Sequence, residues 1–219
     1  SGTIKRRSIR CENELAMNPV QQRDLAMLRE AAQERNQEQL QFYAKRLLMA
    51  LPYYYALAVV TEPLTQFLPR FEAIYPNESW IRQLLLMINA YGASPEDVVA
   101  EMALQQSFDA PGAMNFIKAI YDLTQAMQEK HTSEARIGFM TSALVNVIMA
   151  DLADAWYSER PYAWERVRRN QLDPVTGDYS DPEATQMAYR FWVDDSTVER
   201  ERLSWLAIAA HIESSLERS

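Results

Sequence analysis

The chain has 219 residues, of which 48% are hydrophobic and 24% charged, and its formal net charge is −8. These values exclude a disordered chain, and the acidic balance argues against nucleic acid as the main partner. Five glycines are few for a sheet protein of this length, and a single cysteine, Cys11, cannot close an internal disulfide. We therefore expect an all-α, cytoplasmic protein that binds no cofactor.

The first 17 residues show no hydrophobic period, and they predict a flexible basic arm. Its basic residues are Lys5, Arg6, Arg7 and Arg10. Residues 18–219 are predicted to form one helical domain, with a possible C-terminal helical pair at 181–219.

Cap residues and apolar spacing predict the first helices. Asn18 with Pro19 predicts one helix start and Asn36 a second. The tyrosine- and valine-rich run 53–60 is also typical of a strand, but no partner strand is apparent, so a helix is predicted. A further helix is expected to start at 61–63, and Pro69 is expected to kink or split it. Later starts are predicted near residues 78, 94 and 109.

The segment 132–157 is predicted to be the central helix. Its apolar residues lie on nearly every side, as in a helix enclosed by others. The uncharged apolar stretch 137–150 has 14 residues, which is too short to span a bilayer, so no membrane span is expected. Gly138 is expected to permit a close helix crossing.

Three helices and one loop are predicted for the rest of the chain. Pro161 predicts a helix start, 170–180 is rich in turn residues, and helix starts follow at Asp181 and near 195. About ten helices result, and their starts show no constant period. The sequence therefore predicts an irregular multi-helix bundle around the central helix 132–157, with a short α-solenoid as the alternative.

Chemical motifs are weak. No Gly-rich phosphate loop, zinc signature or cysteine pair occurs, and no catalytic residue is assigned. Asp151 and Asp154 lie three positions apart on the central helix, so they share a face and are weak candidates for holding a divalent metal. The alternative interpretation is a solvated acidic face.

Consecutive aromatic residues give the leading functional clue. A helix cannot bury neighbouring residues on one face, so some of these rings are expected at the surface, where aromatic residues favour protein interfaces. The predicted partner-binding residues are Tyr53, Tyr54, Tyr55, Trp156, Tyr157, Trp164 and Trp192.

Two basic clusters are predicted to contact an anionic partner, preferably an acidic protein. Their residues are Lys5, Arg6, Arg7, Arg166, Arg168 and Arg169.

The sequence thus favours a non-enzymatic interaction module, an adaptor, regulatory or assembly subunit that binds another protein or itself. The alternatives are a divalent-metal-dependent helical enzyme acting on a phosphate-containing small molecule, and a nucleic-acid-binding protein.

Overall fold

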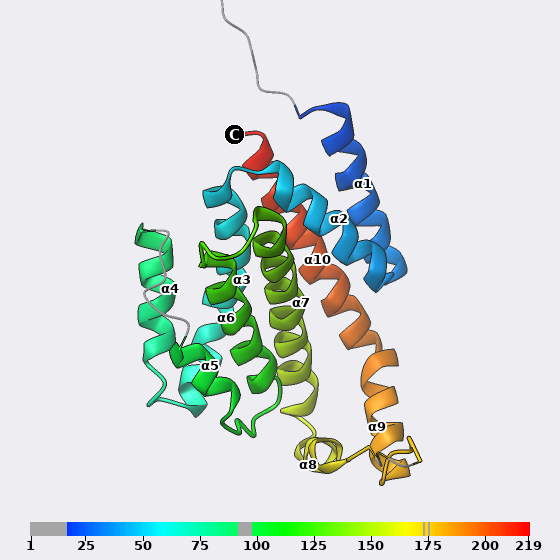
Figure 1. The fold of residues 1–219 in the computed structure, drawn as a ribbon. Helices are drawn as coiled ribbons and strands as arrows, with labels where there is room; N and C mark the ends of the chain where they lie inside the picture. Colours follow the sequence, from blue (N-terminus) through cyan, green and yellow to red (C-terminus); the bar gives the residue numbers. More distant parts are fainter. Residues whose placement is uncertain (1–16, 92–97, 173, 175) are drawn as a thin grey trace, which may run out of the picture.

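The computed structural model describes residues 17–91, 98–172, 174 and 176–219, with side chains described outside 89–99. Within these ranges the chain forms ten α-helices and no strand, which confirms the predicted all-α class (Figure 1). In chain order they are α1 (Pro19–Glu34), α2 (Gln37–Ala50), α3 (Tyr53–Ile74), α4 (Trp80–Tyr91), α5 (Val98–Leu104), α6 (Ala113–Met127), α7 (Ser133–Tyr157), α8 (Pro161–Arg169), α9 (Pro182–Val193) and α10 (Asp195–Leu216). Residues 1–16 of the predicted arm, which include Cys11, and the predicted helix start near 94 lie outside the described residues.

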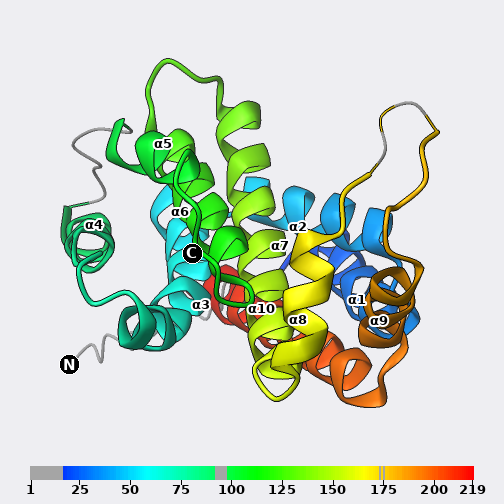
Figure 2. The same ribbon diagram turned by 90° about the horizontal axis from the view of Figure 1, so that it is seen from below.

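Helix α7 is central, as its sequence predicts. It packs against α2, α3, α6, α8 and α10. Figure 2 shows α4 and α5 to one side of α7, with α1 and α9 to the other. Met140, Leu144 and Ala150 lose all exposure because neighbouring helices cover them from several sides. The irregular bundle is therefore the architecture of the described residues.

The length of α7 corrects one argument from the sequence. The helix has 25 residues, so by length and composition alone it could cross a membrane. The shortness of the 14-residue apolar stretch is thus no basis for excluding a membrane span. That the chain has no membrane span stays an expectation. More than half of the 18 most apolar consecutive positions of α7 are buried inside the protein, as in an enclosed core helix.

Helix α3 is continuous, so the helix start expected at 61–63 is wrong. Its 22 residues run through Pro63 and Pro69, and neither proline splits it. Proline removes one backbone hydrogen bond from a helix interior. Here Pro69 is exposed and Pro63 half-buried, while the opposite face buries Leu64, Phe67 and Phe71. Burial of that face against α6 and α7 outweighs the local cost.

A close helix approach occurs at Gly112 and not at Gly138. Gly112 caps α6 with φ +74°, and a Cβ there would lie 2.3 Å from the Ala150 carbonyl oxygen. A Cβ at Gly138 would meet nothing within 4 Å, so the expected crossing there is wrong. The missing side chain of Gly112 lets the start of α6 sit directly against α7.

Helix α10 is held to the body by both apolar and polar contacts. It packs against α1, α2, α3, α7 and α9, and buries Trp205, Ile208 and Ile212. The Glu201 carboxylate, only 3% exposed, accepts hydrogen bonds from Arg35 Nε at 2.7 Å and from Gln37 Nε2. These bonds fasten the α1–α2 turn to α10.

Candidate functional site

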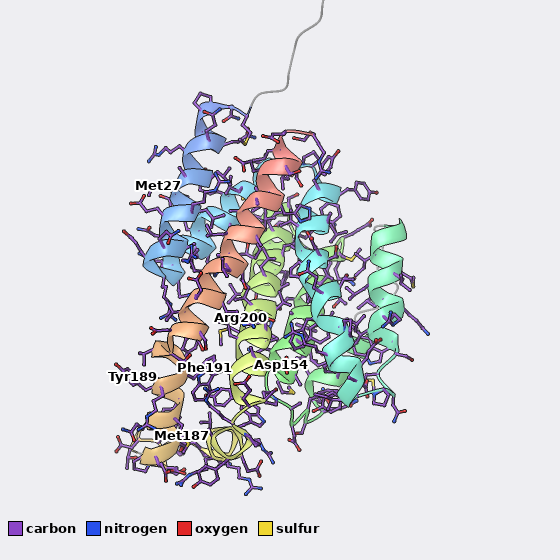
Figure 3. The ribbon with its side chains drawn as sticks, turned by 180° about the vertical axis from the view of Figure 1, so that it is seen from behind. Met27, Asp154, Met187, Tyr189, Phe191 and Arg200 are labelled. Carbon is purple, nitrogen blue, oxygen red and sulfur yellow. The ribbon has the colours of Figure 1, made fainter. Side chains whose placement is uncertain are left out.

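A groove of about 830 Å³ lies between α3, α7 and α10. In Figure 3, α3 and α10 diverge on either side of α7, and Asp154 and Arg200 are labelled in this region. From α3 the lining residues are Val59, Glu62, Pro63, Gln66, Phe67 and Arg70. Helix α7 and its C-terminal end add Val147, Ile148, Asp151, Leu152, Ala155, Trp156, Glu159 and Arg160. Helix α10 adds Ser196, Thr197, Glu199, Arg200, Leu203, Ser204, Ala207, Ile208 and His211.

Each helix presents a single stripe to the groove. The lining positions recur at intervals of three and four residues, which is the spacing of one helical face. At a rise of 1.5 Å per residue, the stripes on α3, α7 and α10 run for about 17, 20 and 22 Å. The groove is therefore an elongated trough bounded by three helix faces.

A chain of ion pairs crosses this trough from α3 to α10. Arg70 donates to Asp151 Oδ1 at 2.5 Å and to Asp154 Oδ2 at 2.9 Å, and its guanidinium lies over the Phe67 ring. Arg200 donates from the other wall to Asp151 Oδ2 at 3.2 Å. Asp151, on the floor, thus joins both walls, and we call this chain the Arg70–Asp151–Arg200 bridge.

A second ion pair joins the walls further along. His211 Nδ1 on α10 contacts the Glu62 carboxylate on α3. Glu62 and Arg70 are eight positions apart, and Arg200 and His211 eleven, so the two bridges are separated by about 12 to 16 Å. Apolar side chains line the groove between the two bridges. Among them Pro63 is half-buried, Leu203 is exposed and Ile208 is buried.

One buried hydroxyl at the groove has no partner. Thr197 lines the groove one turn before Arg200, and its side chain is only 2% exposed. Among the described residues, no group forms a hydrogen bond with its Oγ1. Because this oxygen is itself buried, a group outside the protein does not reach it.

The predicted aromatic set divides into two groups far apart. Tyr53 is half-buried at the start of α3, where its hydroxyl donates to the Ala126 carbonyl at 3.3 Å and its ring lies under Arg136. Tyr54 is 70% exposed and Tyr55 half-buried. The remaining members gather at the other end of α7, about 30 Å from Arg136 along the helix.

At that end the prediction that neighbouring rings must reach the surface is wrong for one pair. Trp156 and Tyr157 are 7% and 3% exposed, because rings from α8 and α9 pack against them. Trp164 is half-buried, with Nε1 donating to the Asp109 carbonyl at 2.6 Å, and Trp192 remains 39% exposed. Burial also raises the pKa of the Tyr157 hydroxyl to about 12. The rings of this cluster therefore pack mainly against one another.

The basic residues of α8 are paired within the protein. Arg166 bonds Asp181 and contacts Glu183, while Arg168 and Arg169 both contact Glu165. An anionic partner would have to compete with these carboxylates. The other predicted contacts, Lys5, Arg6 and Arg7, lie outside the described residues.

The metal candidates Asp151 and Asp154 do share one face of α7, as their spacing predicts. Their oxygens are directed to other groups: Asp151 pairs with Arg70 and Arg200, and Asp154 pairs with Arg70 and accepts from Ser158 Oγ at 3.1 Å. Across the described part of the chain, no three His, Cys, Asp or Glu side chains come together as potential metal ligands.

Sequence reasoning missed Arg70, Thr197 and Arg200. Arg70 follows a proline expected to disturb its helix, and Thr197 and Arg200 looked like ordinary residues near a helix start. Only the three-to-four spacing of α10 could have placed Thr197, Arg200 and Leu203 on one face. Their pairing with α3 and α7 depends on contacts between distant parts of the chain.

Comparison with models of known families, with curated protein sequences and with solved structures finds no match for this chain.

Proposed function

We propose that this chain is a non-enzymatic interaction module that binds an amphipathic α-helix of a partner protein in the groove between α3, α7 and α10. The observation that carries the proposal is the shape of the groove. Three helix faces run beside one another for about 17 to 22 Å, equal to some 11 to 15 residues of helix. Proteins that recognise helices commonly use a trough of this kind.

The two bridges define where the partner's apolar side chains go. Anchors at positions i, i+3 or i+4, and i+7 of a helix span about 10.5 Å. This length fits between the Glu62–His211 pair and the Arg70–Asp151–Arg200 bridge, which are about 12 to 16 Å apart. The anchors would cover Leu203, which is 52% exposed and lines this interval.

The other predicted functions gain less support. A divalent metal at Asp151 and Asp154 would have to displace the guanidinium groups already bound there. Nucleic acid at the α8 cluster would have to displace Glu165, Asp181 and Glu183 from their arginines. The groove needs no such rearrangement to accept apolar side chains.

A selection from a helical peptide library tests the proposal. Random positions on a helix-forming scaffold are displayed on phage and selected against the full chain. We expect enriched peptides to carry an apolar stripe at i, i+3 or i+4, and i+7. Ala207→Glu should weaken their binding at least tenfold, because Ala207 is exposed and lines the groove.

Ala210→Glu supplies the matched control. Ala210 is exposed on the same helix one turn further on but does not line the groove, so the same charge change should leave affinity unaltered. Thermal melting establishes that both variants are folded. Selection without an apolar stripe, or equal binding to both variants, would show that the groove is not the binding site.

A further inference from the structure

We propose that the partner segment continues past the groove and places one large aliphatic or aromatic side chain, a terminal anchor, in a hollow between α8 and α9. The inference rests on the proposed function and extends the binding site of that function. It adds the length of the partner segment and the chemical class of one residue outside its helical stripe. It follows from the continuity of two openings in the protein surface.

The α8–α9 hollow has a volume of about 710 Å³ and adjoins the groove. Trp156, Glu159 and Arg160 line both openings, so the two meet at the C-terminal end of α7. Helices α8 and α9 lie beyond that end of α7 (Figure 1). Glu62 and His211, at the opposite end of the groove, do not line the hollow. A helix bound along the groove therefore reaches the hollow from one of its two ends only.

The accessible surface of the hollow is largely apolar. Tyr162 on α8 is 62% exposed, Val193 at the end of α9 is 48% exposed, and both line the hollow. Met187, which is labelled on α9 in Figure 3, is half-buried and lines it as well. Apolar side chains exposed side by side around a hollow are typical of an interaction site, whereas single exposed ones are not.

The charged groups of the hollow do not select a charged ligand. Two acids, Glu159 and Asp194, and two arginines line it, so neither sign dominates. Arg160 lies over the Trp156 ring at 4.4 Å, donates to the Trp156 carbonyl at 2.9 Å and pairs with Glu159 at 3.6 Å. Asp194 caps the start of α10. The surface left to a partner is therefore the apolar one, which favours an apolar side chain.

Helix geometry gives the spacing of the terminal anchor. Leu203, in the apolar interval of the groove, and Asp194, at the hollow, are nine positions apart at the start of α10. At 1.5 Å per residue this separation is about 14 Å. A partner that stays helical covers it in about nine residues, and an extended one in about four. The terminal anchor is therefore expected about four to ten positions outside the stripe.

The experiment repeats the library selection with about ten random positions added at each end of the helical scaffold. We expect one enriched large apolar residue about four to ten positions outside the stripe, at one end and not at the other. Selection on Val193→Glu should keep the stripe and lose this position, because an apolar side chain cannot be buried against the new charge without cost. Val20→Glu is the matched control, since Val20 is 57% exposed and lines neither opening.

Affinities of the consensus peptide and of a form with alanine at the terminal anchor complete the test. Alanine should weaken binding to the wild-type chain by about tenfold, and to Val193→Glu by less than about twofold. Tyr162→Ala should weaken the consensus peptide by about three- to tenfold, whereas Tyr189→Ala, at a tyrosine 66% exposed and outside the hollow, should leave it unaltered. Thermal melting establishes that all four variants are folded.

The outcomes separate this inference from the proposed function. A stripe without an apolar position outside it, or an equal loss from the alanine peptide on wild type and Val193→Glu, would overturn the terminal anchor and leave the groove as the binding site. Absence of the stripe itself would remove both.

Discussion

Replacing Gly112 with alanine tests the close approach of α6 and α7. The new Cβ would lie 2.3 Å from the Ala150 carbonyl oxygen and 2.8 Å from its Cα, both of which are backbone atoms of α7. Backbone in the middle of a packed helix cannot move aside as a flexible side chain can. Alanine would also have to adopt φ +74°, a left-handed conformation that costs an L-residue about 1 to 2 kcal/mol.

The expected loss of stability combines these two effects. Overpacking of a well-packed core typically costs about 1 to 3 kcal/mol, so Gly112→Ala should lower the free energy of unfolding by about 2 to 5 kcal/mol. Domains of this kind are commonly stable by about 5 to 15 kcal/mol, so the change is large enough to measure by urea denaturation.

Substitutions of two other glycines separate the cost of the backbone conformation from the cost of overpacking. Gly177 has the same φ of +74° but would meet nothing within 4 Å, so Gly177→Ala should cost only about 1 to 2 kcal/mol. Gly138 lies inside α7 with open space around it, so Gly138→Ala should stabilise the protein by about 1 kcal/mol. If Gly112→Ala and Gly177→Ala were equally destabilising, the close packing of Gly112 against Ala150 would be refuted.

Three further predictions concern buried or paired carboxylates. Glu201→Ala should lower the free energy of unfolding by about 2 to 4 kcal/mol, since it removes the buried carboxylate with which the Arg35 guanidinium pairs; denaturant unfolding measures this. Asp122→Ala should cost about 2 to 4 kcal/mol, since Asp122 is fully buried and accepts from Ser142 Oγ at 2.6 Å; the same assay applies. Hydrogen bonds from Arg166 and from backbone amides lower the pKa of Asp181, so its contribution to stability is present above about pH 4 and lost as pH falls through the lower folded pKa.

A control variant or a contradicting outcome accompanies each of these predictions. Glu199→Ala removes an exposed pair with Arg202 and should cost much less stability than Glu201→Ala; an equal loss would contradict the role of burial. For Asp122, full stability of Asp122→Ala would show that the α6–α7 polar contact is dispensable. For Asp181, melting temperature is followed from pH 6 to pH 2. Asp181→Asn should show a smaller acid-induced decrease than wild type, and identical profiles would count against the assignment.

The helices could be predicted from the sequence where local signals and packing agree. Helix α7 is apolar on nearly every side because neighbouring helices enclose it. The distribution of its apolar residues was therefore enough to predict that it is central. The signals failed at α3, where Pro63 and Pro69 are typical of helix ends but burial of the opposite face keeps the helix whole. Local propensity is a weak guide wherever tertiary contacts act against it.

The candidate site was less accessible to prediction. The spacing of Asp151 and Asp154 correctly placed them on one face, but their arginine partners lie 81 to 84 positions away on α3 and 49 positions away on α10. A single sequence contains no local signal for such pairings. The burial of Trp156 and Tyr157 was missed for a related reason, because the rings that cover them belong to α8 and α9.

The position of α10 in the chain has a consequence for folding. It is the tenth described helix, yet it packs on α1, α2, α3 and α7, with Trp205 and Ile212 almost fully enclosed. Those earlier helices must hold an uncovered apolar surface until α10 arrives, and contacts between distant segments form slowly. During synthesis this surface is open to self-association or to chaperones, so the interval before α10 docks is when the chain is most prone to aggregate.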